Sequence, residues 1–262
     1  MEAIIRLSAF FGIFAFMAVW EFYRPRRREP QARRPRWPVN LGMGFLNSML
    51  VRIIAGGALY QVAVYAAESN IGLINRLGIS GWPAVILSFL ALDFAIYAQH
   101  VLFHKVPLFW RLHQVHHTDI HFDATTSIRF HPLEILISMA YKAAIVLLVG
   151  ADAVTTIAFE IILNGCAVFN HSNVYIPESV DRALRWFIIT PDMHRIHHSV
   201  DRTETDTNYG FSVPWWDKLC RTYRAAPRAG QLGMSIGLKP FRKIGELGFL
   251  RLIAMPFERL KT

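Results

Sequence analysis

The sequence predicts an all-α membrane protein with four or five transmembrane helices and a helical cap on the cytoplasmic side. Three observations support this fold class: the composition, a series of apolar runs, and the position of the histidines. Of the 262 residues, 53% are hydrophobic and 18% are charged, whereas a soluble domain carries about 25% charged residues. The positive mean hydropathy of +0.28 also indicates a protein that lies partly in lipid. No long polar linker divides the chain, so we expect a single domain.

The first apolar run covers residues 3–20 and contains a single charge, Arg6. It is about long enough to cross a bilayer. A cleavable signal peptide would place its positive charge before the apolar core. Here the arginines follow the core, so we expect a retained anchor with its N-terminus outside. The second run, 41–67, is interrupted by Arg52, which must pair or reach the interface.

Three further runs follow. The third, 82–103, is broken only by Asp93. The fourth extends from Pro132 to Val149, and the turn "GADA" separates it from the fifth, which ends at Phe169. The fifth run carries Glu160, so it either spans the membrane or re-enters it. This choice accounts for the range of four or five spans.

The first two runs are separated by a basic stretch whose arginines are Arg24, Arg26, Arg27, Arg28, Arg33, Arg34 and Arg36. Beside a span, such a cluster indicates the cytoplasmic side and attracts anionic lipid. Because it directly follows an apolar run, we favour this reading over nucleic-acid binding. Each span moves the chain to the other side of the membrane. If the basic stretch is cytoplasmic, this count places every histidine, and all of 171–262, on the cytoplasmic side.

Six of the eleven histidines form two copies of one motif, "HQVHH" at 113–117 and "HRIHH" at 194–198. "HVLFH" at 100–104 precedes them. Helical residues three or four apart share a face, so each motif presents neighbouring imidazoles. Neutral imidazole binds transition metals. A single zinc site needs about three or four ligands, so the eight to ten histidines available imply a dimetal site in the cap.

Several kinds of metal chemistry can be compared. Zinc hydrolysis favours His-Glu-x-x-His, which does not occur in the chain. A b-type haem would need facing histidines at mid-membrane, and a zinc transporter would place ligands along its spans. Iron and dioxygen acting on a lipid C–H bond fit best. A zinc-dependent hydrolase and a non-enzymatic metal-binding or transport protein remain alternatives. His121 is expected to be an ordinary surface histidine, and Cys166 and Cys220 to be reduced thiols.

Asp93, Tyr97, His100 and His104 follow one stripe of the third run. An acid below a ligand can hold its imidazole in the ligating orientation, so we expect Asp93 to orient His100. The competing hypothesis is an ion pair between Asp93 and Lys142 across the third and fourth spans.

The histidine motifs lie in segments that resemble the fatty acid hydroxylase superfamily, in its sterol desaturase branch. These segments, within residues 85–225, are "DFAIYAQHVLFHKVPLFWRLHQVHHTD", "FDATTSIRFHPLE", "NHSN", "TPDMHRIHHS", "TDTNYG" and "WWDKLCRTY". The resemblance implies an integral membrane, di-iron, O2-dependent oxidoreductase that hydroxylates or desaturates lipids, with hydroxylation favoured. It also implies a separate electron donor, a cytochrome b5-like protein, a ferredoxin or a reductase. Zinc can replace the two irons on purification. In a bacterium the location would be the inner membrane.

The resemblance also implies a set of ligands: His100, His104, His113, His116, His117, His171, His194, His197 and His198. His131 is expected as a further ligand or as the partner of one. The residues expected beside the ligands are Asp93, Tyr97, Asn170, Asp192 and Asn208.

The chain then divides into membrane anchor 1–80, catalytic domain 81–225 and tail 226–262. The basic tail holds anionic headgroups, docks an acidic redox partner, or is simply solvated. Within the tail, residues 248–257 are expected to lie in the membrane interface or to pack beneath the metal domain.

Overall fold

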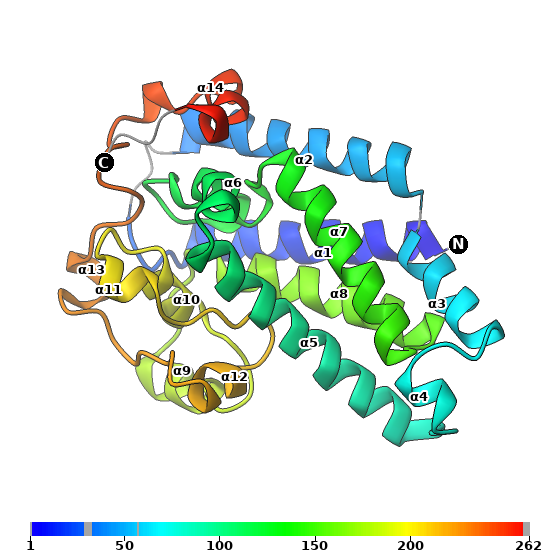
Figure 1. The fold of residues 1–262 in the computed structure, drawn as a ribbon. Coiled ribbons are helices and arrows are strands. Elements are labelled where there is room, and N and C mark those ends of the chain that lie inside the picture. The colour runs from blue at the N-terminus through cyan, green and yellow to red at the C-terminus, as the bar shows by residue number, and fades with distance from the viewer. Residues whose placement is uncertain (1, 29–32, 57, 259–262) are drawn as a thin grey trace.

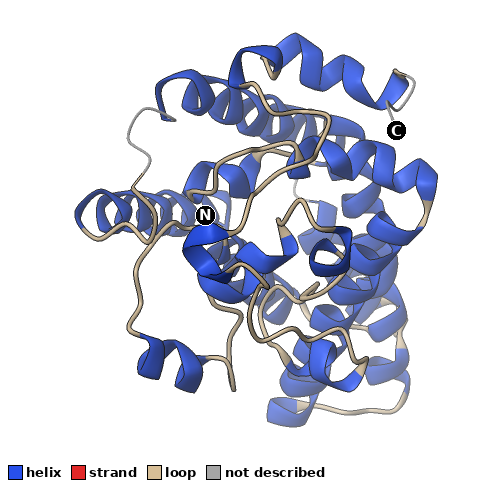
Figure 2. Cartoon of the chain, turned by 90° about the vertical axis from the view of Figure 1, so that its left-hand side faces the viewer, coloured by secondary structure: helices blue, strands red, loops and turns tan. Residues whose placement is uncertain are grey.

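The computed structural model describes residues 2–28, 33–56 and 58–258. It is helical throughout, and no described residue belongs to a β-strand (Figure 2). Within the described residues, five helical stretches are long and apolar enough to cross a membrane. They are α1 (Glu2–Tyr23), α2 (Arg33–Ala55) with α3 (Ala58–Glu68), α5 (Gly81–Lys105), α7 (Pro132–Val149) and α8 (Ala153–Asn170). The all-α fold with five candidate spans is thus confirmed.

Helices α1 and α8 pack along each other, and α3 packs against α7 and α8 (Figure 1). Leu59, Leu92, Phe159 and Leu163 form the apolar core between α3, α5 and α8. The charge in the first run is paired, because an Arg6 guanidinium nitrogen lies 3.1 Å from Glu160 Oε2. The acid that suggested a re-entrant fifth run therefore has a partner, and α8 continues for 18 residues without a break.

The second span differs from the prediction of one run over 41–67. Its helix begins earlier, at Arg33, and α2 ends at Ala55 before α3 begins at Ala58. Gly56 has φ 38°, a left-handed conformation that glycine adopts without steric cost. The chain changes direction there, and Figure 1 shows α3 turning away from the line of α2.

The two loops at one end of the helices lie against each other. A Cβ atom added to Gly72 would lie 2.3 Å from the backbone nitrogen of Gly150. Only a residue without a side chain permits this approach. The loop after α3 and the turn between α7 and α8 therefore share one end of the molecule, as the span count requires.

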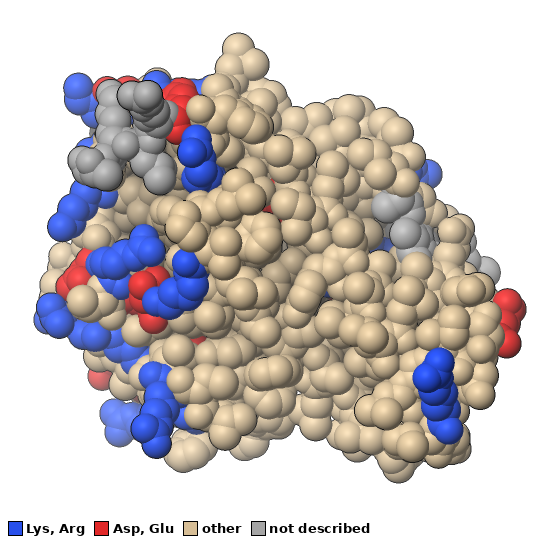
Figure 3. All heavy atoms as spheres, in the orientation of Figure 1, with Lys and Arg blue, Asp and Glu red and all other residues tan. Residues whose placement is uncertain are grey.

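The opposite end carries the cap, where α5 and α8 finish and short helices follow. These are α6 (Pro107–His117), α9 (Glu178–Leu184), α10 (Pro191–His197), α11 (Arg202–Thr205), α12 (Trp215–Leu219) and α13 (Gly230–Gly233). Figure 3 shows Lys and Arg side chains gathered over this end and a broad uncharged surface beside it. The charge distribution matches helices in lipid and a cap in water.

One arginine of the basic stretch, Arg36, has a structural role. This corrects the expectation that it attracts anionic lipid. Arg36 lies in the first turn of α2 and is only 4% exposed. Its guanidinium donates to Asp119 at 2.5 Å and to Asp123 at 2.8 Å. These ion pairs connect the start of α2 to the loop after α6.

Residues 248–257 pack on the body, the second of their two expected positions. Leu252 of α14 (Phe249–Ala254) and Met255 are buried with Met43 and Val115. The Arg111 side chain donates to the carbonyl of Pro256 at 2.6 Å, which fixes the end of the segment.

Candidate metal centre

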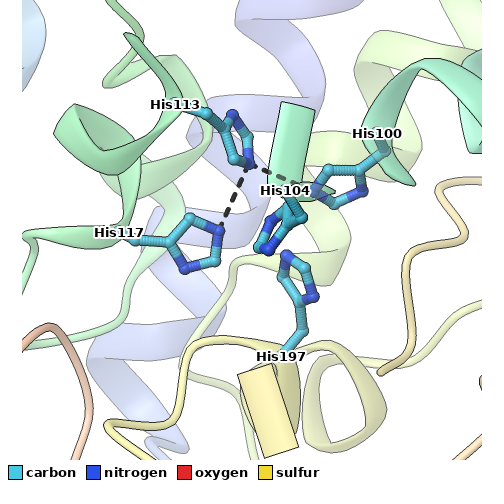
Figure 4. A group of neighbouring side chains, drawn as sticks. All are labelled: His100, His104, His113, His117 and His197. Atoms are coloured by element: carbon cyan, nitrogen blue, oxygen red, sulfur yellow. Dashed lines mark hydrogen bonds between the residues drawn. The ribbon is translucent and has the colours of Figure 1, made fainter. Parts of the chain in front are cut away.

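Nine buried histidines form two adjacent clusters in the cap. In each cluster, one ring nitrogen per residue lies within 4.8 Å of all the others. The first cluster, shown in Figure 4, consists of His100, His104, His113, His117 and His197. The second cluster consists of His116, His171, His194 and His198. The structure thus brings together all nine histidines of the expected ligand set, whereas His131, expected as a further ligand or the partner of one, lies in neither cluster.

The helices explain how each motif divides between the clusters. His113 and His117 lie four residues apart on α6 and share a face, so both enter the first cluster. His116, on the flank, enters the second cluster. In the other motif, His194 enters the second cluster and His197 the first. Each motif therefore contributes to both clusters.

Backbone carbonyls orient three of the rings. Nδ1 of His100 lies 2.7 Å from the Tyr209 carbonyl, and Nδ1 of His197 lies 2.8 Å from the Thr207 carbonyl. Nδ1 of His171 lies 2.6 Å from the carbonyl of Ala167. A carbonyl only accepts hydrogen bonds, so each Nδ1 carries the proton. The lone pair of each Nε2 is then free to bind a metal ion.

A carboxylate orients a fourth ring, and this residue was not predicted. Nδ1 of His113 lies 2.6 Å from Oε1 of Glu134, and both side chains are buried. Histidine ligands commonly donate their second N–H to a carboxylate. Glu134 is the acid in the first turn of α7, a helix that is mostly apolar. The feature of the sequence that could have identified Glu134 was its place at the start of an apolar run, three residues after His131.

The distances between rings fit bound metal ions. Nε2 of His113 lies 3.2 Å from Nε2 of His100 and from Nε2 of His117. Nε2 of His171 lies 3.0 Å from that of His116 and 3.2 Å from that of His194. Two nitrogens about 2.1 Å from one ion at right angles are about 3.0 Å apart. When Nδ1 of His113 donates to Glu134, both nitrogens of the His100–His113 pair present lone pairs, and a cation between them would remove their repulsion.

Other ring nitrogens point to the same conclusion. Both nitrogens of His198 and Nε2 of His104 and His197 are buried without a hydrogen-bond partner among the described residues. Buried polar atoms are normally satisfied. The donors present therefore suit one metal ion in each cluster.

Burial keeps the cap imidazoles in the neutral form that binds metals. It lowers the pKa of His113 to about 3 and that of His171 to about 4. For His198, burial first and the neighbouring His116 and His171 next lower the pKa well below its usual value. The carbonyl of Ala167 acts in the opposite direction on His171 but does not outweigh its burial.

Asp93 does not orient His100, which corrects the prediction. Its Oδ2 accepts a hydrogen bond from Trp216 Nε1 at 2.8 Å, which ties α5 to α12. Nδ1 of His100 is bonded to Tyr209 instead. The alternative pair with Lys142 is also wrong, since Lys142 Nζ lies 4.0 Å from Glu160 Oε1.

Tyr97 and Asn170 act on the clusters through other residues. The Tyr97 hydroxyl lies 2.9 Å from that of Thr222, and its ring packs against the ring of Tyr209. The Asn170 amide donates to the Phe211 carbonyl at 2.7 Å. Tyr209 and Phe211 in turn contact the ring of His100.

Asp192 and Asn208 also hold the elements that carry the histidines, and each does so through residues other than the imidazoles. Asp192 lies 2.9 Å from an Arg26 guanidinium nitrogen and also pairs with Arg195. The Asn208 amide donates to the Met193 carbonyl at 3.0 Å, within α10. Their expected place directly beside the ligands is therefore corrected.

His131 is not part of either cluster, which corrects its expected role. It is the N-cap of α7, where Nδ1 accepts the Leu133 N–H at 3.2 Å. Nε2 then carries the proton and donates to the Ile253 carbonyl at 3.2 Å. Its two nitrogens thus hold α7 and the tail. His121 also lies outside both clusters, as predicted.

Comparison with known proteins agrees with this geometry. The chain is 27% identical over 250 residues to ornithine lipid hydroxylase OlsE of Rhizobium tropici, covering 94% of this chain and 73% of that protein. It is 26% identical to human alkylglycerol monooxygenase and 26% identical to rat cholesterol 25-hydroxylase. These matches cover 60% and 56% of the chain, and 34% and 49% of those proteins. No solved protein structure matches the chain significantly.

The sequence model of the family described as fatty acid hydroxylase matches residues 85–222. This range holds all nine histidines of the two clusters and more than half of the chain. The five apolar helices and the hydroxylase relatives together identify an integral membrane oxidoreductase. The chain belongs to the fatty acid hydroxylase family.

Proposed function

We propose that the protein is a di-iron, O2-dependent hydroxylase that oxidises a C–H bond of a membrane lipid. The observation that carries this proposal is the pair of buried, neutral histidine clusters at the cap end of the apolar helices. The relatives named above are a hydroxylase of ornithine lipid, a monooxygenase of alkylglycerol and a hydroxylase of cholesterol. These names support a lipid substrate, and favour hydroxylation over desaturation by the same site.

The nine clustered histidines are the proposed ligands. Two bound iron ions would supply the reductive activation of dioxygen that an unactivated C–H bond requires. The chain's own residues hold the imidazoles in place and keep water out. Carbonyls and Glu134 fix the ring orientations. The ring of Phe130 stacks on His116 with centroids 4.3 Å apart, and helps to exclude water from the second cluster.

The clusters are proposed to lie on the cytoplasmic side, with the catalytic domain covering 81–225 between the anchor 1–80 and the tail 226–262. The arginines after α1 support this orientation. In a bacterium, the inner membrane would be the location. Electrons would come from a separate cytochrome b5-like protein, ferredoxin or reductase. The basic side chains over the cap (Figure 3) favour a donor with an acidic surface.

Metal analysis of protein purified without oxygen, from zinc-limited cells, tests the proposal. We expect about two iron ions per chain, and O2 consumption when a reductant and membrane lipid are added. Retained metal without O2 consumption would support a metal-binding or transport protein instead. Zinc with lipid hydrolysis would indicate a hydrolase.

A further inference from the structure

A pocket of about 330 Å³ lies where α1 ends and α2 begins. Ligand sites typically have volumes of about 300–1,000 Å³. Its lining includes Glu21, Tyr23, Arg28, Arg33 and Phe122. Because α1 is a candidate span that ends at Tyr23, the pocket lies at the depth of lipid headgroups.

One wall of the pocket adjoins the second histidine cluster. The ring of Phe122 is only 4% exposed, and its centroid lies 5.0 Å from that of His198 and 5.5 Å from that of His171. A molecule in the pocket therefore rests on the ring that covers the second cluster.

Arginines give the mouth of the pocket a positive charge. Arg28 is exposed, and Arg33 is half-buried beside Trp37. Arg36 also lines the pocket, but Asp119 and Asp123 neutralise it. An anionic group of a ligand would thus meet Arg28 and Arg33, since guanidinium groups bind phosphate and carboxylate well.

Deeper in the pocket, a carboxylate has one unused oxygen. Oε1 of the buried Glu21 accepts the N–H groups of Ala124 at 2.7 Å and Asn173 at 2.6 Å. Oε2 is buried and has no hydrogen-bond partner among the described residues. Such an oxygen calls for a donor, and a ligand ammonium group supplies both the hydrogen bond and the opposite charge.

We propose that this pocket binds the headgroup of a zwitterionic lipid. The ammonium group lies against Glu21, and the anionic group lies against Arg28 and Arg33. The exposed side chains of Phe22 and Tyr23, at the end of α1, contact the start of the lipid's chains. That this lipid is the substrate rests on the proposed function, whereas binding itself does not require turnover.

Lipid binding to the full chain in detergent, measured by native mass spectrometry without reductant, tests the proposal. The probes are short-chain phosphatidylethanolamine, phosphatidic acid and diacylglycerol. We expect wild type to bind phosphatidylethanolamine most tightly, because it alone carries both charges. Glu21→Gln keeps an acceptor for the two N–H groups and should weaken phosphatidylethanolamine binding by about tenfold or more. Phosphatidic acid binding should not weaken.

The double variant Arg28→Ala/Arg33→Ala should weaken binding of both charged lipids and leave diacylglycerol unchanged. Arg34→Ala, which changes an exposed arginine next to Arg33 on α2 but outside the pocket lining, is the control. Unchanged phosphatidylethanolamine binding in the double variant, or equal binding of phosphatidic acid and phosphatidylethanolamine by wild type, overturns the proposal. Full competition by free phosphoethanolamine would also overturn it, by indicating a soluble ligand. An inactive protein that retains this binding pattern would refute the hydroxylase function alone.

Discussion

Oε1 of Glu134 lies 2.6 Å from Nδ1 of His113 and joins the first turn of α7 to α6. The carboxylate sets which nitrogen of His113 faces the first cluster. Glu134→Gln should therefore lower the affinity for iron about 10–100-fold, the usual effect of losing such a partner. Anaerobic iron titration of the purified protein measures this effect.

Asp93→Asn is the matched control, since Asp93 is also a buried acid near the cap but bonds to Trp216. It should keep its iron affinity. Equal affinities for Glu134→Gln and wild type would mean that the carboxylate does not support a ligand.

The division into two clusters predicts separable metal loss. His104→Ala removes a ring from the first cluster, and His198→Ala removes one from the second. Each variant should lose mainly one of the two metal ions and all hydroxylation, as measured by elemental analysis and product formation. Full metal content in both variants would show that the clusters are not the metal sites.

His131→Ala tests the corrected role of that residue. Because His131 caps α7 and bonds to Ile253, we expect a loss of about 1 kcal/mol in the free energy of unfolding. Metal content should equal that of wild type. Loss of one metal ion at unchanged stability would restore His131 to the ligand set.

The ion pairs of Arg36 lead to a prediction about the stability of the fold that does not involve the histidine clusters. Arg36→Met leaves Asp119 and Asp123 buried without their cation, which typically costs about 3–5 kcal/mol. Arg34→Met, on the exposed side of the same helix, should change stability by less than about 0.5 kcal/mol. Denaturant unfolding in detergent compares the two variants, and equal stability would contradict the argument.

The pH dependence of this pair has a definite sign. Arg36 holds the pKa of Asp119 below its usual value, in spite of its burial. A lowered carboxyl pKa stabilises the fold at pH values above the unfolded pKa of about 3.9. This contribution should thus be constant between about pH 5 and 8 and be lost as the pH falls below about 4, as unfolding measured across that range will show.

The span count predicts which segments share a side of the membrane. Reporters inserted within 24–32 or fused after Thr262 should both report the cytoplasm. Reporters near Asn70 and Asp152 should report the same side, because the loops at Gly72 and Gly150 touch, and the span count predicts that this side is the outside. A C-terminal reporter on the outside would mean that one of the five helices does not cross.

The sequence predicted the spans and the histidines of the three motifs because both depend on local spacing, whereas His171 entered the expected ligand set through the resemblance to the family. A period of three to four residues determines which imidazoles share a face of α5, α6 or α10. It does not determine which helix packs opposite. For this reason Asp93, on the same stripe as His100, was the wrong acid. Glu134, 21 residues beyond His113 in the chain, could not be selected without the packing of α6 against α7.

His131 and Arg36 show the same limit. A histidine directly before Pro132 can cap a helix or bind a metal, and only the position of Ile253 and the clusters separates these roles. The arginines after α1 look alike in sequence. Arg36 has a structural role because Asp119, 83 residues further along the chain, accepts a hydrogen bond from it.

The central claim is that the two histidine clusters hold the iron that hydroxylates a lipid. A single turnover of reduced, iron-loaded protein with membrane lipid and isotopically heavy dioxygen, followed by lipid mass spectrometry, tests it most directly. The account predicts a lipid that has gained one heavy oxygen atom with wild type, and none with His104→Ala or His198→Ala. A lipid that has lost two hydrogens without gaining oxygen, or a labelled product from either variant at the wild-type level, would contradict it.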